Sequence, residues 1–297
     1  MASDSRGWIL GCGVLFVVLL MLSGLAMLFV SMQMSGDRLG LPRPGPKVGV
    51  VEVTGVLGDD DDVLEQLERF KEDGSIRALV LHVNCPGGAV GTTQRIIARI
   101  EGFKADGLPV VAALDDVAAS GGYYVATAAD SIFALPGTLT GSIGVIMSFP
   151  DFSGLMKKLG VDNQVVKAGP YKDAGSPFRP LTPEERGWMT DVLADVHEQF
   201  IAAVIAGRPA MPADSVRAMA DGRFFSGQQA YRAGLVDRLT DLDEAVRAAG
   251  RMAGIKGEPV VVRKHKETPA WQKWLEERVP AGLPLSGRWP RLEYRWR

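Results

Sequence analysis

The sequence predicts an α/β protein, a layered domain with a mainly parallel sheet that follows a membrane anchor. Short apolar runs alternate with longer amphipathic runs along most of the chain, and strands separated by helices favour parallel βαβ crossovers. The 297-residue chain is 46% hydrophobic and 23% charged, which is the balance of a globular protein. Its net charge of −2 gives no electrostatic reason to expect a nucleic acid as partner.

The N-terminus is the exception to this globular average. Residues 8–30 form a run of 23 residues without a charge, long enough to cross a hydrocarbon core of roughly 30 Å. A cleaved signal peptide is the alternative, although its apolar region normally spans only about 7–15 residues. We expect residues 1–34 to be an uncleaved anchor in membrane lipid, and the Gly- and Pro-rich residues 35–47 to be a linker.

The first half of the body alternates between strands and helices. The expected strands are 48–57, 78–83, 109–114 and 131–135, and the expected helices start near 59–62 and cover 92–104 and 120–129. The four acids at 59–62 lack the alternating ligands and the glycine of an EF-hand loop. We therefore expect them at a helix N-terminus, where the helix dipole favours acids, and we expect no metal site.

The second half begins with less regular structure. We expect short strands over 145–148 and 164–166 on either side of a helix over 153–159. The longest expected helix covers 182–207, because Thr182 is a good cap and a proline and two acids follow it.

The C-terminal residues differ in composition from the body. Residues 263–297 hold nine Lys or Arg and four of the six tryptophans, so we separate a tail, 259–297, from a globular domain over 48–258. Tryptophan and arginine together are typical of a membrane interface or a partner surface. Packing of these aromatic side chains on the body is the alternative.

A glycine-rich segment, NCPGGAV at 84–90, stands between an expected strand and an expected helix. Consecutive glycines at such a turn leave backbone N–H groups uncovered, as a developing oxyanion requires. Gly87 and Gly88 are therefore candidate oxyanion donors. An ordinary tight turn is the alternative.

Ser120 stands in the same relation to the next strand and helix, in the segment ASGGYY. Both segments would then lie at the carboxyl ends of parallel strands, where sites form in open α/β sheets. The small neighbours Ala119 and Gly121 leave room for a substrate carbonyl beside a nucleophilic hydroxyl. A serine at a helix start is alternatively a simple N-cap.

A nucleophilic serine needs a base, and the histidines are poor candidates. His82, His197 and His265 all lie outside glycine-rich turns, and structural roles suit them better. Lys172, in the small-residue loop AGPYKD, is the better candidate. A lysine acts as a base near neutral pH only if its pKa falls from about 10.4 toward roughly 7–8. The alternative is a solvated lysine paired with Asp173.

Two further residues are candidates for a functional site. Ser142, in TGSIGV, could be the nucleophile, could orient Lys172, or could be a structural turn residue. Cys85 is a second possible nucleophile, although a proline follows it directly.

These segments in this order resemble the signal peptide peptidases of the SppA type, a membrane-anchored branch of the ClpP and crotonase structural superfamily. The resemblance covers roughly residues 48–250 and rests on VGVVEVTGVL, NCPGGAV, ASGGYYVA, TGSIGV, GPYKD with SPFRPLTPEE, and DGRFFSGQQAYRAGLVDRL. It implies a ClpP/crotonase-like βαβ superhelical layered domain behind an N-terminal transmembrane helix.

The resemblance also implies roles for particular residues. Ser120 would be the nucleophile and Lys172 its general base. The amides of Gly87 and Gly88 would form the oxyanion hole, and Ser142 would hold the lysine amine in place. The family usually has serine where this chain has Cys85, which puts one local hydrogen bond in doubt. No cofactor or metal ion enters this mechanism.

The family's assembly and substrates are the last implications. Its short members form rings or domes of identical subunits in which serine and lysine meet across a subunit boundary. Their substrates are apolar peptides, such as remnant signal peptides, and their single-pass catalytic domain is extracytoplasmic. The few basic residues around the span lean toward a cytoplasmic body instead. A crotonase-like acyl-CoA enzyme and a non-catalytic membrane scaffold are the rival functions.

Overall fold

The computed structural model describes residues 21–24, 45–58, 61–263 and 293–295. The chain divides into two compact units, Met1–Gly45 and Pro46–Arg297. Of the predicted span at 8–30, only residues 21–24 are described, and they are helical. No helix within the described ranges is both long and apolar enough for a membrane crossing.

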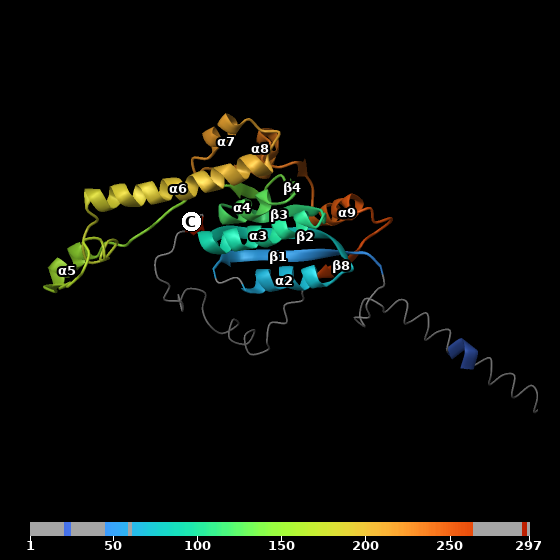
Figure 1. The fold of residues 1–297 in the computed structure, drawn as a ribbon, viewed down its shortest axis with the longest axis horizontal. Helices are drawn as coiled ribbons and strands as arrows, with labels where there is room; N and C mark the ends of the chain where they lie inside the picture. Colours follow the sequence, from blue (N-terminus) through green and yellow to red (C-terminus); the bar gives the residue numbers. More distant parts are fainter. Residues whose placement is uncertain (1–20, 25–44, 59–60, 264–292, 296–297) are drawn as a thin grey trace, which may run out of the picture. The chain divides into compact units, whose positions relative to one another are not determined.

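A largely parallel sheet forms the centre of the second unit (Figure 1). Its strands are β1 (Lys47–Leu57), β2 (Ile76–Ala89), β3 (Val110–Ala119), β4 (Ser131–Ala134), β5 (Leu139–Gly141), β6 (Phe224–Ser226), β7 (Arg238–Leu239), β8 (Val260–Arg263) and β9 (Glu293–Arg295). The main order is β6-β5-β3-β2-β1-β8, while β4 joins β3 to β7 and β9 joins β2. The β5–β6 and β2–β9 pairs are antiparallel and the other described pairs are parallel. The predicted α/β class is confirmed.

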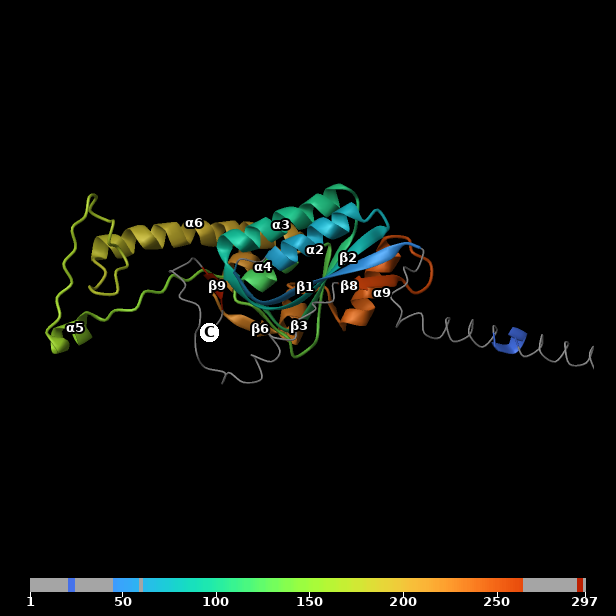
Figure 2. The ribbon, with the colours of Figure 1, turned by 90° about the horizontal axis from the view of Figure 1, so that it is seen from below.

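Helices cover both faces of this sheet. They are α2 (Asp61–Glu72), α3 (Val90–Ala105), α4 (Gly121–Thr127), α5 (Ser153–Leu159), α6 (Pro183–Gly207), α7 (Ala213–Met219), α8 (Gly227–Ala233) and α9 (Leu242–Met252). Figure 2 shows α2, α3 and α4 on one face of the strands, with α9 near the other end of the sheet.

The buried apolar side chains fall into two clusters, one for each face. The larger joins Leu81 of β2 to Leu67, Ile96, Tyr123 and Phe200 of the helices α2, α3, α4 and α6. The smaller joins alternate residues of β1, β2 and β3 to the alanines of α9. Burial of each large apolar side chain contributes about 1.5–3 kcal/mol to the stability of the fold. The packing on both faces therefore holds the strands of the sheet in place.

The structure differs from the sequence-based expectations at several strands. The strands predicted over 145–148 and 164–166 are wrong, because the chain there runs without a continuous strand partner and Ile146 forms only an isolated bridge. Strand β2 continues through the glycine-rich segment to Ala89 instead of ending at 83. Residues 260–263, which we grouped with the tail, pair with β1. Backbone pairing with a neighbour, more than local β-propensity, decides where a strand forms.

The predicted long helix α6 is confirmed together with its cap. Thr182 accepts a hydrogen bond from the Glu185 N–H at 3.2 Å, and the Glu185 carboxylate accepts one from the Thr182 N–H at 3.0 Å. This is a capping box, which satisfies two donors at the helix start. The helix over 153–159 is confirmed as well.

His82 lies between two carboxylates on neighbouring strands. Its Nδ1 is 2.6 Å from a Glu52 oxygen on β1, and its Nε2 is 3.2 Å from an Asp115 oxygen on β3. A neutral imidazole can donate from only one nitrogen, so this arrangement suits the protonated ring. The hydrogen bond to Glu52 is the largest cause that raises the pKa of His82 above its usual value.

We predict that His82→Asn destabilises the protein more in acid than in alkali. Because the pKa of His82 is raised in the folded state, its stabilisation is complete below the unfolded pKa of about 6.5 and disappears as the pH rises through the folded value. We expect a loss of about 1–2 kcal/mol near pH 5.5 and a smaller loss near pH 9, measured by urea denaturation. An equal loss at both pH values would contradict this assignment.

Candidate active site

Ser120 occupies the turn between β3 and α4 in a strained backbone conformation. Its φ of 55° and ψ of −120° lie outside the regions that non-glycine residues adopt readily. Such a conformation costs on the order of 1–3 kcal/mol and is concentrated at functional sites. Ser120 stands at the N-cap position of α4, yet its side chain makes no capping hydrogen bond and the residue is only 2% exposed. The interpretation of Ser120 as a simple N-cap is therefore wrong.

Ser142 is the second strained serine, and it lies next to the first. Among the described residues, Ser120 and Ser142 are the non-glycine residues with positive φ, and that of Ser142 is 51°. Strand β5 pairs in parallel with the end of β3, and the Ser120 N–H donates to the Gly141 carbonyl at 2.8 Å. The two serines therefore end adjacent parallel strands.

The glycine segment of β2 touches the Ser120 turn backbone to backbone. A Cβ added to Gly121 would lie 3.2 Å from both the Gly87 Cα and the Gly88 N. A Cβ added to Gly122 would overlap the carbonyl oxygen of Cys85. The structure thus brings Gly87 and Gly88 to Ser120, as the positions of both segments at strand ends predicted.

The Gly87 amide has a weak partner in this structure. Its N–H donates to the Cys85 Sγ with an N···S distance of 3.3 Å, and its φ of 105° is a value that favours glycine. Sulfur is a weak acceptor, so an oxyanion would compete well for this donor. Cys85 itself is fully buried, which disfavours it as a nucleophile.

The other edge of the glycine segment carries an antiparallel strand. Residues Gly87, Gly88 and Ala89 pair with β9, in which Arg295 stands opposite Gly87. The backbone of this segment is therefore able to receive an extended chain from outside the parallel sheet.

Helix α4 is held by buried aromatic side chains directly after Ser120. The Tyr123 hydroxyl donates to the Leu235 carbonyl at 2.9 Å, and burial raises the pKa of Tyr123. The Tyr124 ring stacks on Phe200 of α6 with centroids 4.4 Å apart. These contacts fix the helix start and so resist relaxation of the strained turn.

Lys172 is not brought to Ser120 within one chain. It lies in the loop between α5 and α6, and both views show α5 and the first half of α6 extending away from the sheet and α4 (Figures 1 and 2). Its side chain is exposed and forms no hydrogen bond or ion pair with any residue that the structure describes. We call residues 150–190 the arm.

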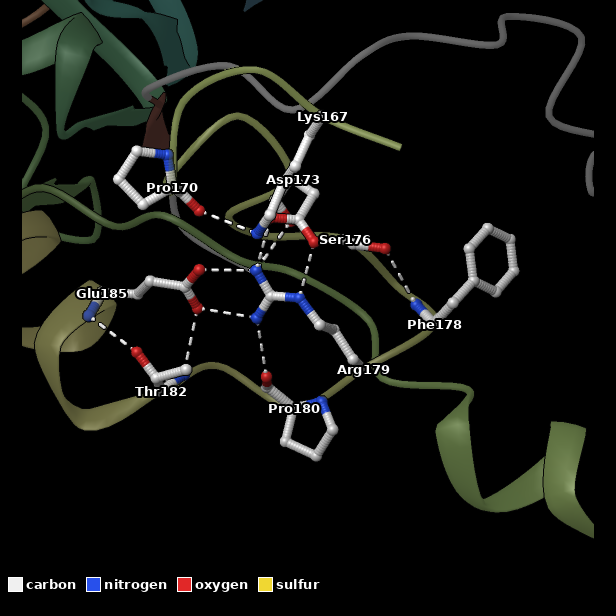
Figure 3. A network of polar contacts seen from close by, with 9 residues as sticks. All are labelled: Lys167, Pro170, Asp173, Ser176, Phe178, Arg179, Pro180, Thr182 and Glu185. Atoms are coloured by element: carbon white, nitrogen blue, oxygen red, sulfur yellow. Dashed lines mark hydrogen bonds and ion pairs between the residues drawn. The ribbon is translucent and has the colours of Figure 1, made fainter. Parts of the chain in front are cut away.

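Asp173 does not pair with Lys172, which overturns the simple alternative for this lysine. Its carboxylate instead binds Arg179 and Lys167, as Figure 3 shows. Arg179 is not among the predicted site residues, although its spacing of six residues from both Asp173 and Glu185 could have indicated an ion-pair cluster.

The two described histidines have structural partners. His82 is engaged by Glu52 and Asp115, and the His197 Nε2 lies 3.2 Å from the Ile143 carbonyl, next to Ser142. These contacts agree with the expectation that neither is the base for Ser120. His265 lies outside the described residues.

One family model and several proteins named as proteases match this chain. The sequence profile of peptidase family S49 matches residues 102–256. A Synechocystis sp. protein provisionally named a protease is 38% identical over 72% of this chain and 77% of its own length. An Enterococcus faecium protein provisionally named signal peptide peptidase SppA is 30% identical over 87% and 79% of the two lengths. Protease 4 of Salmonella typhi is 35% identical over 78% of this chain but 39% of its own length.

We predict that Gly122→Ala disrupts the site, whereas Gly91→Ala does not. The added methyl group at 122 overlaps the Cys85 carbonyl, while that at 91, also in a helix, meets nothing within 4 Å. Such overpacking typically costs about 1–3 kcal/mol, which corresponds to a fall of about 2–12 °C in melting temperature for a domain of 150–250 residues. Thermal unfolding and peptide hydrolysis measure both effects, and equal behaviour of the two variants would contradict the close backbone contact.

Proposed function

The chain belongs to peptidase family S49 and is a serine protease of the SppA type, and from this premise we propose that it is a membrane-anchored endopeptidase with a Ser120/Lys172 dyad. The observation that carries the proposal is the burial and backbone strain of Ser120. Its hydroxyl is buried, makes no capping bond, and stands in a strained turn against two glycines.

The proposed reaction follows the usual order of acyl transfer. The neutral Lys172 amine takes the Ser120 proton as the Oγ attacks the scissile carbonyl carbon, and the negative oxygen is stabilised by the Gly87 and Gly88 amides. Lysine then protonates the leaving amine, which breaks the peptide bond. Water, deprotonated by the same amine, hydrolyses the acyl-enzyme. Ser142 orients the lysine amine.

Peptides are the proposed substrates because the site edge accepts an extended chain. Residues Gly87–Ala89 already pair with a strand, β9, in the antiparallel sense. Addition of a strand to a sheet edge is a common mode of peptide recognition, since main-chain hydrogen bonds do not depend on sequence. Apolar peptides from the membrane, such as remnant signal peptides, fit an enzyme anchored through residues 8–30 with an extracytoplasmic domain.

The dyad is proposed to form between two copies of the chain. Lys172 is exposed on the arm, whereas a lysine acts as a base only in surroundings that disfavour its charged form. A second surface must therefore cover it. The arm exposes large apolar side chains suited to such a contact, namely Phe152, Leu155, Leu159, Val166, Tyr171, Phe178 and Trp188. A homo-oligomer would cover these side chains and bring Lys172 to the Ser120 of a neighbour.

We predict that Ser120→Ala abolishes both peptide hydrolysis and labelling by a fluorophosphonate probe. Turnover should fall by at least about 10³-fold, because loss of a nucleophile removes the covalent route. The matched control is Ser142→Ala, the other strained serine, which should keep the covalent label because it only orients the base. Full hydrolysis by Ser120→Ala would refute the assignment.

A mixing experiment tests the shared dyad. Ser120→Ala and Lys172→Met should each be inactive alone, and co-assembled mixtures should recover part of the activity. Recovery is expected because some boundaries then pair an intact Ser120 with an intact Lys172. Mixed oligomers verified by mass that remain inactive would show that the dyad forms within one chain or not at all.

A further inference from the structure

Arg179 holds two carboxylates of the arm with both edges of its guanidinium group (Figure 3). Its Nε and Nη2 each donate to an Asp173 oxygen at 2.9 Å. Its Nη1 and Nη2 donate to the two Glu185 oxygens at 2.9 and 2.5 Å. Further bonds reach the backbone carbonyls of Asp173 and Pro180 at 3.2 Å. Bidentate pairs of this kind are among the stronger and more directional polar contacts in proteins.

The charges of this cluster balance. Asp173 and Glu185 are negative, whereas Arg179 and Lys167 are positive, and Lys167 binds both Asp173 and the Pro170 carbonyl. The Glu185 side chain is 3% exposed and that of Asp173 13%. The hydrogen bond from Arg179 is the largest cause that lowers the pKa of both carboxyls, to about 2 for Glu185. Both acids are therefore ionised throughout the range in which a peptidase works.

Lys172 stands between two anchored neighbours. Asp173 is held by Arg179, and the Tyr171 ring stacks on Trp188 of α6 with centroids 5.8 Å apart. The Lys172 side chain itself is exposed and makes no polar contact with the described residues. The arm thus fixes the backbone on both sides of this lysine and leaves its amine available.

An ionised aspartate next in sequence is unfavourable for a lysine base. A carboxylate within about 4–6 Å of an amine favours the protonated, non-basic form. Arg179 and Lys167 occupy the Asp173 oxygens and so remove them from competition for the amine.

We propose that Arg179 is a positioning residue for Lys172. Arg179 binds the Asp173 carboxylate and thereby prevents that acid from pairing with the Lys172 amine. The inference rests on the proposed function of Lys172 as the base. Lysine at 179 would be a poor replacement, because a single ammonium cannot grip two carboxylates bidentately. Within the part of the chain that the structure describes, Arg179 forms ion pairs with Asp173 and Glu185, and Lys167 forms one with Asp173. Tyr171 is the titratable neighbour of Lys172 on the other side.

The test is the pH dependence of fluorophosphonate labelling in the full-length oligomer. In Arg179→Gln, Asp173 keeps only its side-chain contact with Lys167 and can turn toward Lys172. The acid limb, the low-pH range in which the labelling rate falls, should therefore move upward by about one pH unit. In Arg179→Gln with Asp173→Asn the limb should return close to its wild-type position. A role limited to structural support lowers the rate at every pH, leaves the limb in place and is not rescued by Asp173→Asn. That result would overturn the proposal.

Two controls separate the possible failures. The first control is Lys172→Met. If this variant labels at the wild-type rate, the proposed base is wrong and this inference fails with it. If it does not label, and the acid limb of Arg179→Gln stays at its wild-type position, only the role of Arg179 is refuted.

The second control applies if Arg179→Gln does not fold. Arg179→Lys then replaces it and should give a smaller upward shift of the acid limb, which Asp173→Asn again reverses. No shift in the folded Arg179→Lys enzyme would refute the proposal.

Discussion

The backbone contact between the Ser120 turn and the glycines of β2 is the constraint on which the rest of the site depends. A Cβ at Gly122 would overlap the carbonyl oxygen of Cys85, and one at Gly121 would lie 3.2 Å from the backbone of Gly87 and Gly88. The strained conformation of Ser120, which costs on the order of 1–3 kcal/mol, persists because the adjacent helix is anchored by buried side chains. Tyr123 and Phe200 are fully buried in the larger core cluster, and each contributes about as much as the strain costs.

The sheet then places the second serine beside the first. Strand β3 pairs with β4 over its first half and with β5 over its second, so it changes partner between residues 114 and 117. Because of this change of partner, the three-residue strand β5 ends beside Ser120. Ser142 follows β5 directly and has a positive φ of its own. Two strained serines side by side are hard to explain by packing alone, and they favour a catalytic role for this edge.

The proposed nucleophile and the proposed base lie in opposite surroundings in the single chain. Ser120 is buried in the rigid body, whereas Lys172 is exposed on an arm rich in apolar side chains. Under the proposed function this separation has a use, since an isolated protomer cannot form the dyad and cannot cleave peptides at random. The Arg179 network would keep the Lys172 amine available on the arm, because Arg179 binds Asp173, the acid next to Lys172 in the sequence.

Local residue patterns were enough to predict the α/β class, the cap of the long helix and the meeting of the glycine and serine segments, because these follow from short-range preferences and from parallel strands ending at one edge. Resemblance to a family assigned roles to Ser120 and Lys172 that spacing alone could not. Three outcomes required the folded chain: β2 continues through the glycines, residues 145–148 and 164–166 are not strands, and Asp173 binds Arg179. Those outcomes depend on which backbone or side chain from elsewhere in the sequence becomes the partner of a given residue, and a local residue pattern does not specify that partner.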